Sequence, residues 1–377
     1  MAGIIQPGMF PQPLTSRERF RRVMHYQSVD RVPHFEFGYW NETYRTWHQQ
    51  GLPERIDNEN AANAYFGFDR FGCCPVNDWN WLCPPFEPAV LEEDEKHRVI
   101  IDADGIKCMI NKDGSSSIPH VLEYPLKNRQ DWLRFKERLD PDDPKRFPPD
   151  WPRMLNEYTY RDYALGLHIG SLLGLLRDWI GFEQIALMFY DDPDLLEEMI
   201  EYLCQFNLRI IDKLASVISF DYANGWEDIA FKNGPLLSPA MFKRFLAPRH
   251  ERIAKTLHGY GIDVIFTDCD GDINALVEFW LASGFNCMFP LEVGCGTDPV
   301  ALRDRYGKQL LLIGGVNKRQ LIAGKRAIDE ELARLAPLVE EGGFIPHVDH
   351  RCPPDVTLEN YLYYMEGKKK ILGYKSA

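Results

Sequence analysis

The sequence lacks several features that would define its class at once. No stretch approaches the roughly 20 apolar residues needed to span a bilayer, which argues against a membrane protein. Basic residues are outnumbered, with 43 Lys and Arg against 56 Asp and Glu, so the net charge is −13 and we expect no nucleic-acid partner. The nine cysteines include no Cys-x-x-Cys pair, which favours reduced thiols over a disulfide framework.

Motifs that bind nucleotides are also missing. No G-x-x-x-x-G-K-[ST] loop occurs, and Gly294-Cys295-Gly296 lacks the third glycine of a dinucleotide-binding turn. We therefore expect no NAD and no other nucleotide cofactor. The first 16 residues have no basic segment followed by an apolar one, and they contain three prolines, which argues against a cleavable signal helix. We expect a cytoplasmic protein.

The 377 residues suit one large barrel with insertions or two ordinary domains. Residues 1–14 are interpreted as a flexible N-terminal arm, after which residues 15–18 form a capping box that starts a helix. The segment 34–150 is rich in aromatic residues, proline and turn signals such as Asp104-Gly105. It predicts an aromatic-rich lid or insertion with β-hairpins, inside a single domain that spans 15–377.

From about residue 160 onward, short apolar runs alternate with helical patterns. The runs include VIFT, CMFPL, LLLIGG and FIPHV, and they are apolar throughout rather than at every second position. This pattern of hydrophobicity is typical of parallel strands that helices cover on both faces. The number of such units favours an α/β fold of the (β/α)8 TIM-barrel type over a doubly wound sheet.

Polar residues follow each of these apolar runs at once. In a barrel, the positions just after the strands lie on one rim, where side chains distant in sequence converge on a cavity. The residues in question are Asp221, Asn224, Glu227, Asp228, Asp268, Cys269, Asp270, Glu292, Asn317, Asp349 and His350. This rim is the candidate active site.

The same residue types cap helices in any protein, and we interpret Asp272 and Asp298 in that way. Asp268 and Asp270 stand two residues apart just past a strand end, so they share a face and are candidates for catalysis. His350, which precedes a double-proline stop, is the third candidate.

Glu227 and Asp228 suggest a further acid or base. Because adjacent residues on an extended segment point in opposite directions, at most one of them faces the cavity, and Glu227 is our candidate. Cys269 and Cys352 flank the strongest acids but lack a paired spacing, so we interpret both as small buried hydrophobic residues.

Three stretches carry a resemblance to a known family. They are TSRERFRRVMHYQSVDRVP at 15–33, IGSLLGLLRDWIGFEQIALMFYDDPDLLEEMI at 169–200 and PHVDHRCPPDVTLENYLYY at 346–364. On these stretches the chain resembles the uroporphyrinogen decarboxylase superfamily from about residue 15 to 372. The resemblance implies a (β/α)8 barrel with its pocket at the C-terminal rim of the strands, and a homodimer that associates through barrel faces.

The chain departs from the true uroporphyrinogen decarboxylases of that superfamily. Those enzymes hold substrate carboxylates with an Arg-x-Ala-Gly-Arg run, whereas the equivalent stretch here is HFEFGYWNETYR. The family's substrate-holding Asp is likewise not matched by FGCCPVNDW. A tetrapyrrole rich in carboxylates needs such cationic groups, so a role in haem biosynthesis is not expected.

The methyltransferase branch of the superfamily carries a His-x-Cys-Gly motif and a later Cys, which together bind zinc. Here Asp268-Cys269-Asp270-Gly271 stands at the motif with Asp in place of both ligands, and His350 stands where the last ligand, or the histidine of the decarboxylases, would be. The resemblance therefore implies a site for Zn²⁺ or another divalent metal made by Asp268, Asp270 and His350, which Glu292 would complete.

The leading hypothesis is a methyltransferase that demethylates a small methoxylated or methylamine-type compound and passes the methyl group to a cobalamin. No Asp-x-His-x-x-Gly motif is present, so the corrinoid would be carried by a separate protein. The rim residues would hold a metal or deliver a proton. Substrate contacts are expected from Tyr39, Trp40, Trp79 and Asn317.

Two alternatives stay open. A decarboxylase of a small carboxylic acid would need cationic residues in its pocket, for which Arg177, Arg351 and Lys232 are the candidates. A barrel that has kept its fold and lost its chemistry would instead serve as a binding partner, and its rim acids would all be used in caps and salt bridges.

Overall fold

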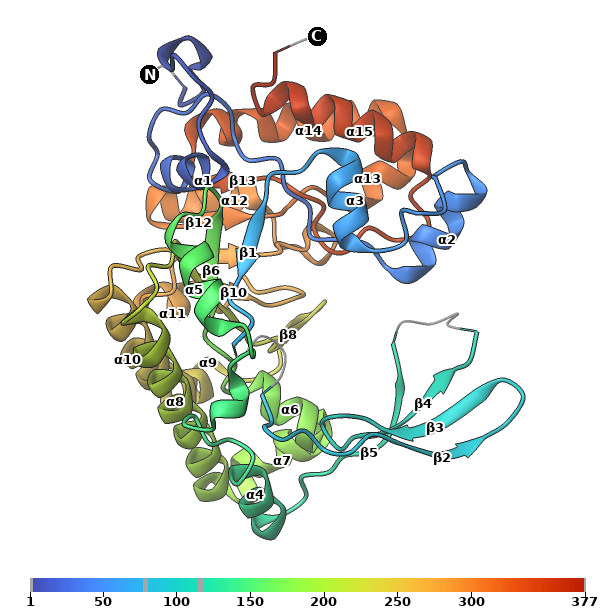
Figure 1. Ribbon diagram of the computed structural model, residues 1–377, viewed down its shortest axis with the longest axis vertical. Coiled ribbons are helices and arrows are strands. Elements are labelled where there is room, and N and C mark those ends of the chain that lie inside the picture. Colours follow the sequence, from blue (N-terminus) through green and yellow to red (C-terminus); the bar gives the residue numbers. More distant parts are fainter. Residues whose placement is uncertain (1–2, 77–80, 114–117, 376–377) are drawn as a thin grey trace.

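A computed structural model describes residues 3–76, 81–113 and 118–375 (Figure 1). Within these residues the central sheet has seven strands, and every neighbouring pair is parallel. In spatial order the strands are β1 (Phe71–Cys73), β6 (Ala164–His168), β7 (Tyr222–Trp226), β10 (Ile265–Asp268), β11 (Cys287–Phe289), β12 (Leu311–Ile313) and β13 (Phe344–Ile345). Strands β6, β11, β12 and β13 are buried along their whole length, as the uniformly apolar runs predicted.

Helices precede the sheet, connect its strands and follow it. Their bounds are α1 (Ser16–Met24), α2 (Asn41–Gln49), α3 (Glu59–Phe66), α4 (Arg129–Lys136), α5 (Trp151–Thr159), α6 (Gly174–Ile180), α7 (Phe182–Asp191), α8 (Pro193–Ala215), α9 (Pro239–Met241), α10 (Ala247–Gly259), α11 (Val277–Ala282), α12 (Pro299–Tyr306), α13 (Lys318–Ala323), α14 (Lys325–Glu341) and α15 (Leu358–Ile371). The predicted capping box is confirmed, since the Thr15 side chain accepts from the Glu18 amide and Glu18 returns a bond to the Thr15 amide.

An extended segment, residues 34–39, lies between the two outer strands of the sheet. The His34 carbonyl accepts a 2.8 Å hydrogen bond from the Asp69 amide just before β1, and the Gly38 carbonyl accepts one of 2.9 Å from the Cys352 amide after β13. The Phe35 ring contacts Phe71 on one side and His347 on the other. The parallel sheet is thus a half-barrel that this segment bridges, an arrangement consistent with a TIM-like barrel and with the predicted α/β class.

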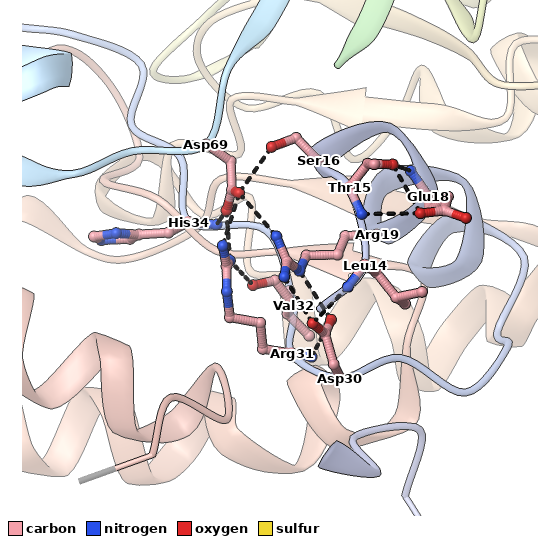
Figure 2. A network of polar contacts seen from close by, with 10 residues as sticks. All are labelled: Leu14, Thr15, Ser16, Glu18, Arg19, Asp30, Arg31, Val32, His34 and Asp69. Carbon is pink, nitrogen blue, oxygen red and sulfur yellow. Dashed lines mark hydrogen bonds and ion pairs between the residues drawn. The ribbon is translucent and has the colours of Figure 1, made fainter. Parts of the chain in front are cut away.

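The Asp69 carboxylate fixes this junction (Figure 2). It accepts hydrogen bonds from the Ser16 hydroxyl at 2.9 Å, from the His34 amide at 2.8 Å and from both terminal nitrogens of Arg31. Burial raises the pKa of Asp69, but the hydrogen bonds and charge of Arg31 outweigh it and hold the pKa below its usual range. One carboxylate thus joins α1, the start of the extended segment and the residues before β1.

The predicted hairpins are present. Strands β2 (Ala89–Glu93), β3 (His97–Ile101), β4 (Lys107–Asn111) and β5 (His120–Glu123) form an antiparallel sheet, and β8 (Ala230–Phe231) pairs with β9 (Gly234–Pro235). Gly105 lies in the turn between β3 and β4 with φ of +83°, as its Asp-Gly signal predicted. In Figure 1 the four-stranded sheet projects at the lower right, away from α8 and α10. The lid is not confirmed, because 34–150 also supplies the extended segment and β1 to the barrel.

The described part of the N-terminal arm, residues 3–14, is hydrogen-bonded to the rest of the chain. Within its described part, the Ile4 amide donates to the Glu340 carbonyl at 2.7 Å, the Ile4 side chain is buried, and the Leu14 amide donates to Asp30 at 3.1 Å. The three prolines and two glycines of this arm do not indicate which part of the fold it contacts.

Two further expectations concern the whole chain. None of the described helices is long and apolar enough to cross a membrane. All nine cysteines lie in the described residues, and no disulfide joins any of them.

A buried ion pair connects the extended segment to the C-terminal helix. The Lys368 ammonium of α15 lies 2.6 Å from the Glu36 carboxylate, and both side chains are excluded from solvent. The same carboxylate accepts from the Tyr364 hydroxyl at 2.9 Å and from the Val348 amide at 3.1 Å. Glu36 therefore holds the chain after β13 in register with residues 34–39.

Replacing Lys368 by Met should lower the free energy of unfolding by about 3–5 kcal/mol, because the Glu36 charge would stay buried without its partner. Urea unfolding measures this. The matched control is Lys370→Met on the exposed side of the same helix, where we expect a change within about 0.5 kcal/mol. Equal effects of the two substitutions would contradict the role assigned to the pair.

Candidate active site

A cavity of about 320 Å³ occupies the interior of the barrel. Each of the seven parallel strands supplies a wall residue, and along β7 and β10 these are alternate residues, because successive side chains of a strand point to opposite faces. The Phe and Tyr residues of the wall are Phe20, Phe35, Phe37, Phe71, Tyr222, Phe266 and Phe289. The rest are Glu59, Gly72, Cys73, His168, Asn224, Asp268, Ile313, Ile345 and Arg351. A mostly apolar wall with a few polar groups is typical of a small-molecule site.

Asp268 is the last residue of β10, and its side chain lines the cavity. Burial raises the pKa of this carboxyl well above its usual range, and the neighbouring carboxyl groups of Asp270 and Asp228 raise it further. These surroundings favour the protonated form of the Asp268 carboxyl over the ionised one.

The carboxyl groups of Asp228, Asp268 and Asp270 form a cluster that we call the carboxyl cluster. Asp228 accepts a 2.9 Å hydrogen bond from the Asp270 amide, and its other oxygen lies 3.4 Å from the Arg177 guanidinium. Burial and the charge of Asp270 raise the pKa of Asp228, against the influence of Arg177. The backbone of Asp228 is strained, with φ of +36°. In this conformation the side chain reaches the Asp270 amide just beyond β10.

His350 lies in the chain after β13 and contacts the carboxyl cluster through Asp270. Its Nε2 atom lies 3.1 Å from the Asp270 carboxylate, and its ring stacks on Trp40 with centroids 5.4 Å apart. The second oxygen of Asp270 is buried and has no hydrogen-bond partner among the described residues. The predicted neighbours Asp270 and His350, 80 residues apart in sequence, are thus in direct contact.

A second charged network joins the loops that follow β11, β12 and β13. Lys318 Nζ lies 2.8 Å from Glu292 and 3.9 Å from Asp349, whose carboxylate also accepts hydrogen bonds from the Val293 and Lys318 amides, each at 3.0 Å. Burial raises the pKa of Asp349 to about 6, although Lys318 opposes the shift. Because Asp349 precedes His350, this network holds the backbone from which the imidazole extends.

The four expected metal ligands do not converge on one point. Glu292 is held by Lys318 and by the Gly271 amide at 2.9 Å. Across residues 3–76, 81–113 and 118–375, no group of three or more His, Cys, Asp or Glu side chains is placed to hold a metal ion. The arrangement does not fit a metal site, and we derive no chemical step through one.

Glu227, a predicted acid or base, is used inside the fold. Its carboxylate accepts hydrogen bonds from the amides of Leu172, Leu173 and Gly174 at the start of α6, and from His250 at 3.1 Å. Its side chain is buried and does not belong to the cavity wall. A carboxylate at a helix N-terminus stabilises the exposed amides there, which is a structural role.

The expected substrate contacts have different positions. The Tyr39 hydroxyl pairs with that of Tyr361 at 2.6 Å in the hydrophobic core, away from the described cavity wall. Asn317 caps α13 by accepting from the Arg319 amide at 3.0 Å. Trp40 lies against His350 rather than on the wall. Trp79 lies outside the described residues.

Sequence reasoning missed the aromatic wall. Phe266 was part of a recognised apolar run, but only the register between strands shows which alternate positions face inward. Of the three cations considered for a decarboxylase, Arg351 alone lies on the described wall, where it pairs with Glu59. Sequence reasoning also missed Lys318. Its position directly after the rim residue Asn317 is the signal that could have identified it as a residue of the site.

An α/β barrel with an interior cavity and with acids and a histidine beyond its strand ends is typical of TIM-barrel enzymes. The family model for uroporphyrinogen decarboxylase (URO-D) matches residues 99–370, and the chain belongs to this family, as the three sequence stretches predicted. Its fold is similar to that of a methyltransferase from Methanosarcina mazei, with a TM-score of 0.60 and 15% identity, over 95% of this chain and 99% of the other. No curated protein gives a sequence match.

The structural role of Glu227 is testable. Glu227→Gln should lower the free energy of unfolding by about 1.5–3 kcal/mol, because an amide replaces a charged acceptor of several backbone hydrogen bonds. Glu183→Gln on the exposed start of α7 is the control, with an expected change within about 0.5 kcal/mol. If Glu227→Gln lost activity while its free energy of unfolding, measured with urea, stayed unchanged, Glu227 would again be a candidate catalytic residue.

Proposed function

We propose that this protein is a methyltransferase that removes the methyl group of a methoxylated aromatic compound and transfers it to a cob(I)alamin carried by a separate protein. The observation that carries the proposal is the position of Asp268 on the wall of an aromatic cavity, where burial and two neighbouring carboxyl groups raise the pKa of its carboxyl well above the usual range. The likeness to the Methanosarcina mazei methyltransferase is in keeping with it.

The proposed reaction explains why the site needs an acid. In a displacement at the methyl carbon, the reduced cobalt supplies the nucleophile, and the bond between carbon and oxygen breaks. The leaving oxygen gains an electron pair and needs a proton, which Asp268 can donate. A quaternary ammonium donor leaves as a neutral amine and needs no proton, so the acid favours an oxygen donor.

The shape of the cavity supports an aromatic donor. Its wall carries seven Phe and Tyr side chains, and its volume of about 320 Å³ suits a single substituted ring. Ring faces and edges of such side chains bind other aromatic rings through offset and edge contacts. The cavity would orient the methoxy group toward Asp268 and exclude water from the reacting atoms.

The neighbouring residues have supporting roles in this proposal. The charge of Asp270 helps to keep Asp268 protonated, and His350 holds Asp270 in place through their 3.1 Å contact. Activation of the leaving group is assigned to the Asp268 proton rather than to a metal. Elemental analysis of the wild type and of His350→Ala checks this assignment. Stoichiometric Zn²⁺ in the wild type that is absent from His350→Ala would show that a metal, rather than Asp268, activates the leaving group.

A decarboxylase of a small carboxylic acid is the second candidate, because Arg351 lies on the cavity wall where it could hold a carboxylate. In that reaction Asp268 would protonate the carbanion that loss of carbon dioxide leaves. Release of carbon dioxide from a panel of aromatic and aliphatic acids, with no methyl transfer from any ether, would favour this candidate.

Asp268→Asn should lower the rate of methyl transfer from a methoxyarene by about 10²–10⁴-fold, because the leaving oxygen loses its proton donor. Methyl-cobalamin formation with a cob(I)alamin protein, followed in the visible spectrum, measures the rate. The internal control is a methyl donor whose phenol product is strongly acidic, such as a nitrophenyl methyl ether. Its rate of methyl transfer should fall much less, because its leaving oxygen needs less protonation. An equal loss with both donors would contradict acid catalysis by Asp268.

Asp270→Asn should move the alkaline decline of activity to lower pH. Activity requires protonated Asp268 and falls as the pH rises through its pKa, and the substitution removes a negative charge that raises this pKa. A pH profile of kcat tests this, with Asp355→Asn in the exposed loop before α15 as the control. A profile unchanged from that of the wild type would show that Asp270 does not influence the acid.

A further inference from the structure

The guanidinium of Arg351 places a positive charge on the wall of the aromatic cavity. Among the described wall residues it is the one Lys or Arg side chain. His168, which also lines the cavity, is neutral at pH 7, because burial lowers its pKa to about 4. The charge of Arg351 lowers the pKa of Asp268, against the effect of burial. The cation and the proposed acid thus line one cavity and are close enough to interact.

Three contacts hold the Arg351 guanidinium in place. Its Nη1 atom donates to the Tyr39 carbonyl at 3.3 Å and to the Glu59 carboxylate at the start of α3. The guanidinium carbon lies 5.4 Å from the centroid of the Phe37 ring. Gly38 leaves room for the ion pair, since a β-carbon there would lie 2.5 Å from the Glu59 carboxylate and 3.0 Å from Nη1. The guanidinium is therefore fixed before any ligand binds.

The other edge of the same guanidinium is open. The Nε and Nη2 atoms of Arg351 have no hydrogen-bond partner in the part of the chain that the structure describes. Neither atom is buried, and 33% of the side-chain surface is exposed. The N–H groups on this edge are parallel, and their spacing matches the two oxygens of a carboxylate. The open edge therefore suits a carboxylate that binds through both oxygens.

The rest of the wall indicates which molecule carries this carboxylate. Seven Phe and Tyr side chains line the cavity, and the surroundings of Asp268 favour its uncharged form. One cation with the Glu59 carboxylate beside it suits a ligand of a single negative charge. A phosphate group, which carries about two negative charges at pH 7, would lack a counter-charge. An aromatic ring with one carboxylate fits both the apolar wall and the single cation.

We propose that Arg351 determines substrate specificity by binding the carboxylate of the methyl donor, so that the substrate class is a methoxylated aromatic carboxylic acid. This deepens the proposed function and rests on it for the reacting methoxy group. The carboxylate binds to the Nε–Nη2 edge, and the ring packs against the aromatic side chains of the wall. Arg351 and Asp268 thus orient the donor from two fixed points of the cavity.

Binding experiments test this without any methyl transfer. Calorimetry at pH 7 with the full-length protein would compare 2-, 3- and 4-methoxybenzoate, each with its methoxybenzamide, in which a neutral amide replaces the carboxylate. We expect at least one of the acids to bind the wild type about tenfold or more tightly than its amide. Arg351→Met should remove this preference, while the affinity for the amide stays within about threefold.

Glu59→Gln distinguishes carboxylate binding from a structural role of the ion pair. This variant breaks the same pair but removes a negative charge beside the open edge, so the preferred acid should bind at least as tightly as to the wild type. A loss of affinity as large as that in Arg351→Met would overturn the inference. Arg351→Gln repeats the test if Arg351→Met does not fold, and thermal unfolding reports the folding of each variant. No preference for any acid in the wild type, or a preference retained in a folded Arg351 variant, would also overturn it.

The transfer reaction separates this inference from the proposed function. If both hold, Arg351→Met should raise KM for the preferred acid far more than it lowers kcat, because the carboxylate contact is present before and during the reaction. Methyl transfer that proceeds equally well from the acid and from its amide would sustain the proposed function and refute the role of Arg351. Preferential binding of the acid without any methyl transfer would do the reverse.

Discussion

Everything in this site depends on one electrostatic constraint, namely that the Asp268 carboxyl cannot easily ionise where the fold places it. The group stands at the end of an inner strand of the parallel sheet, on the wall of an aromatic cavity and beside two further carboxyl groups. Negative charge there would meet both poor solvation and repulsion. The barrel creates this situation because it joins inward-facing aromatic residues of the strands with acids that follow the strand ends.

Charged networks outside the cavity keep that arrangement in place. Asp69 and the buried pair Glu36–Lys368 hold the extended segment 34–39 between β1 and β13, which brings Phe35 and Phe37 into the wall. Glu227 binds the start of α6, and Lys318 joins the loops after β11, β12 and β13. Polar residues outside the cavity thereby hold the residues of its wall in place.

Particular residues show which parts of the fold and of the candidate site could be predicted from the sequence. Uniformly apolar runs predicted parallel strands, and polar residues directly after them predicted the contact of Asp270 with His350, because strand ends in a barrel meet at one rim. The same signal misled at Asn317, since an asparagine after a strand caps a helix equally well. Glu292 was misjudged because its partner Lys318 is close only in the folded chain.

The measurement that tests the account most directly is the protonation state of Asp268 itself. Infrared difference spectroscopy of the wild type against Asp268→Asn detects the carbonyl stretch of a protonated carboxyl, which an ionised one lacks. The account predicts that the Asp268 signal is that of the protonated acid at pH 7 and disappears only at higher pH. A carboxylate signal at pH 7 that gains its proton only near pH 4 would contradict it.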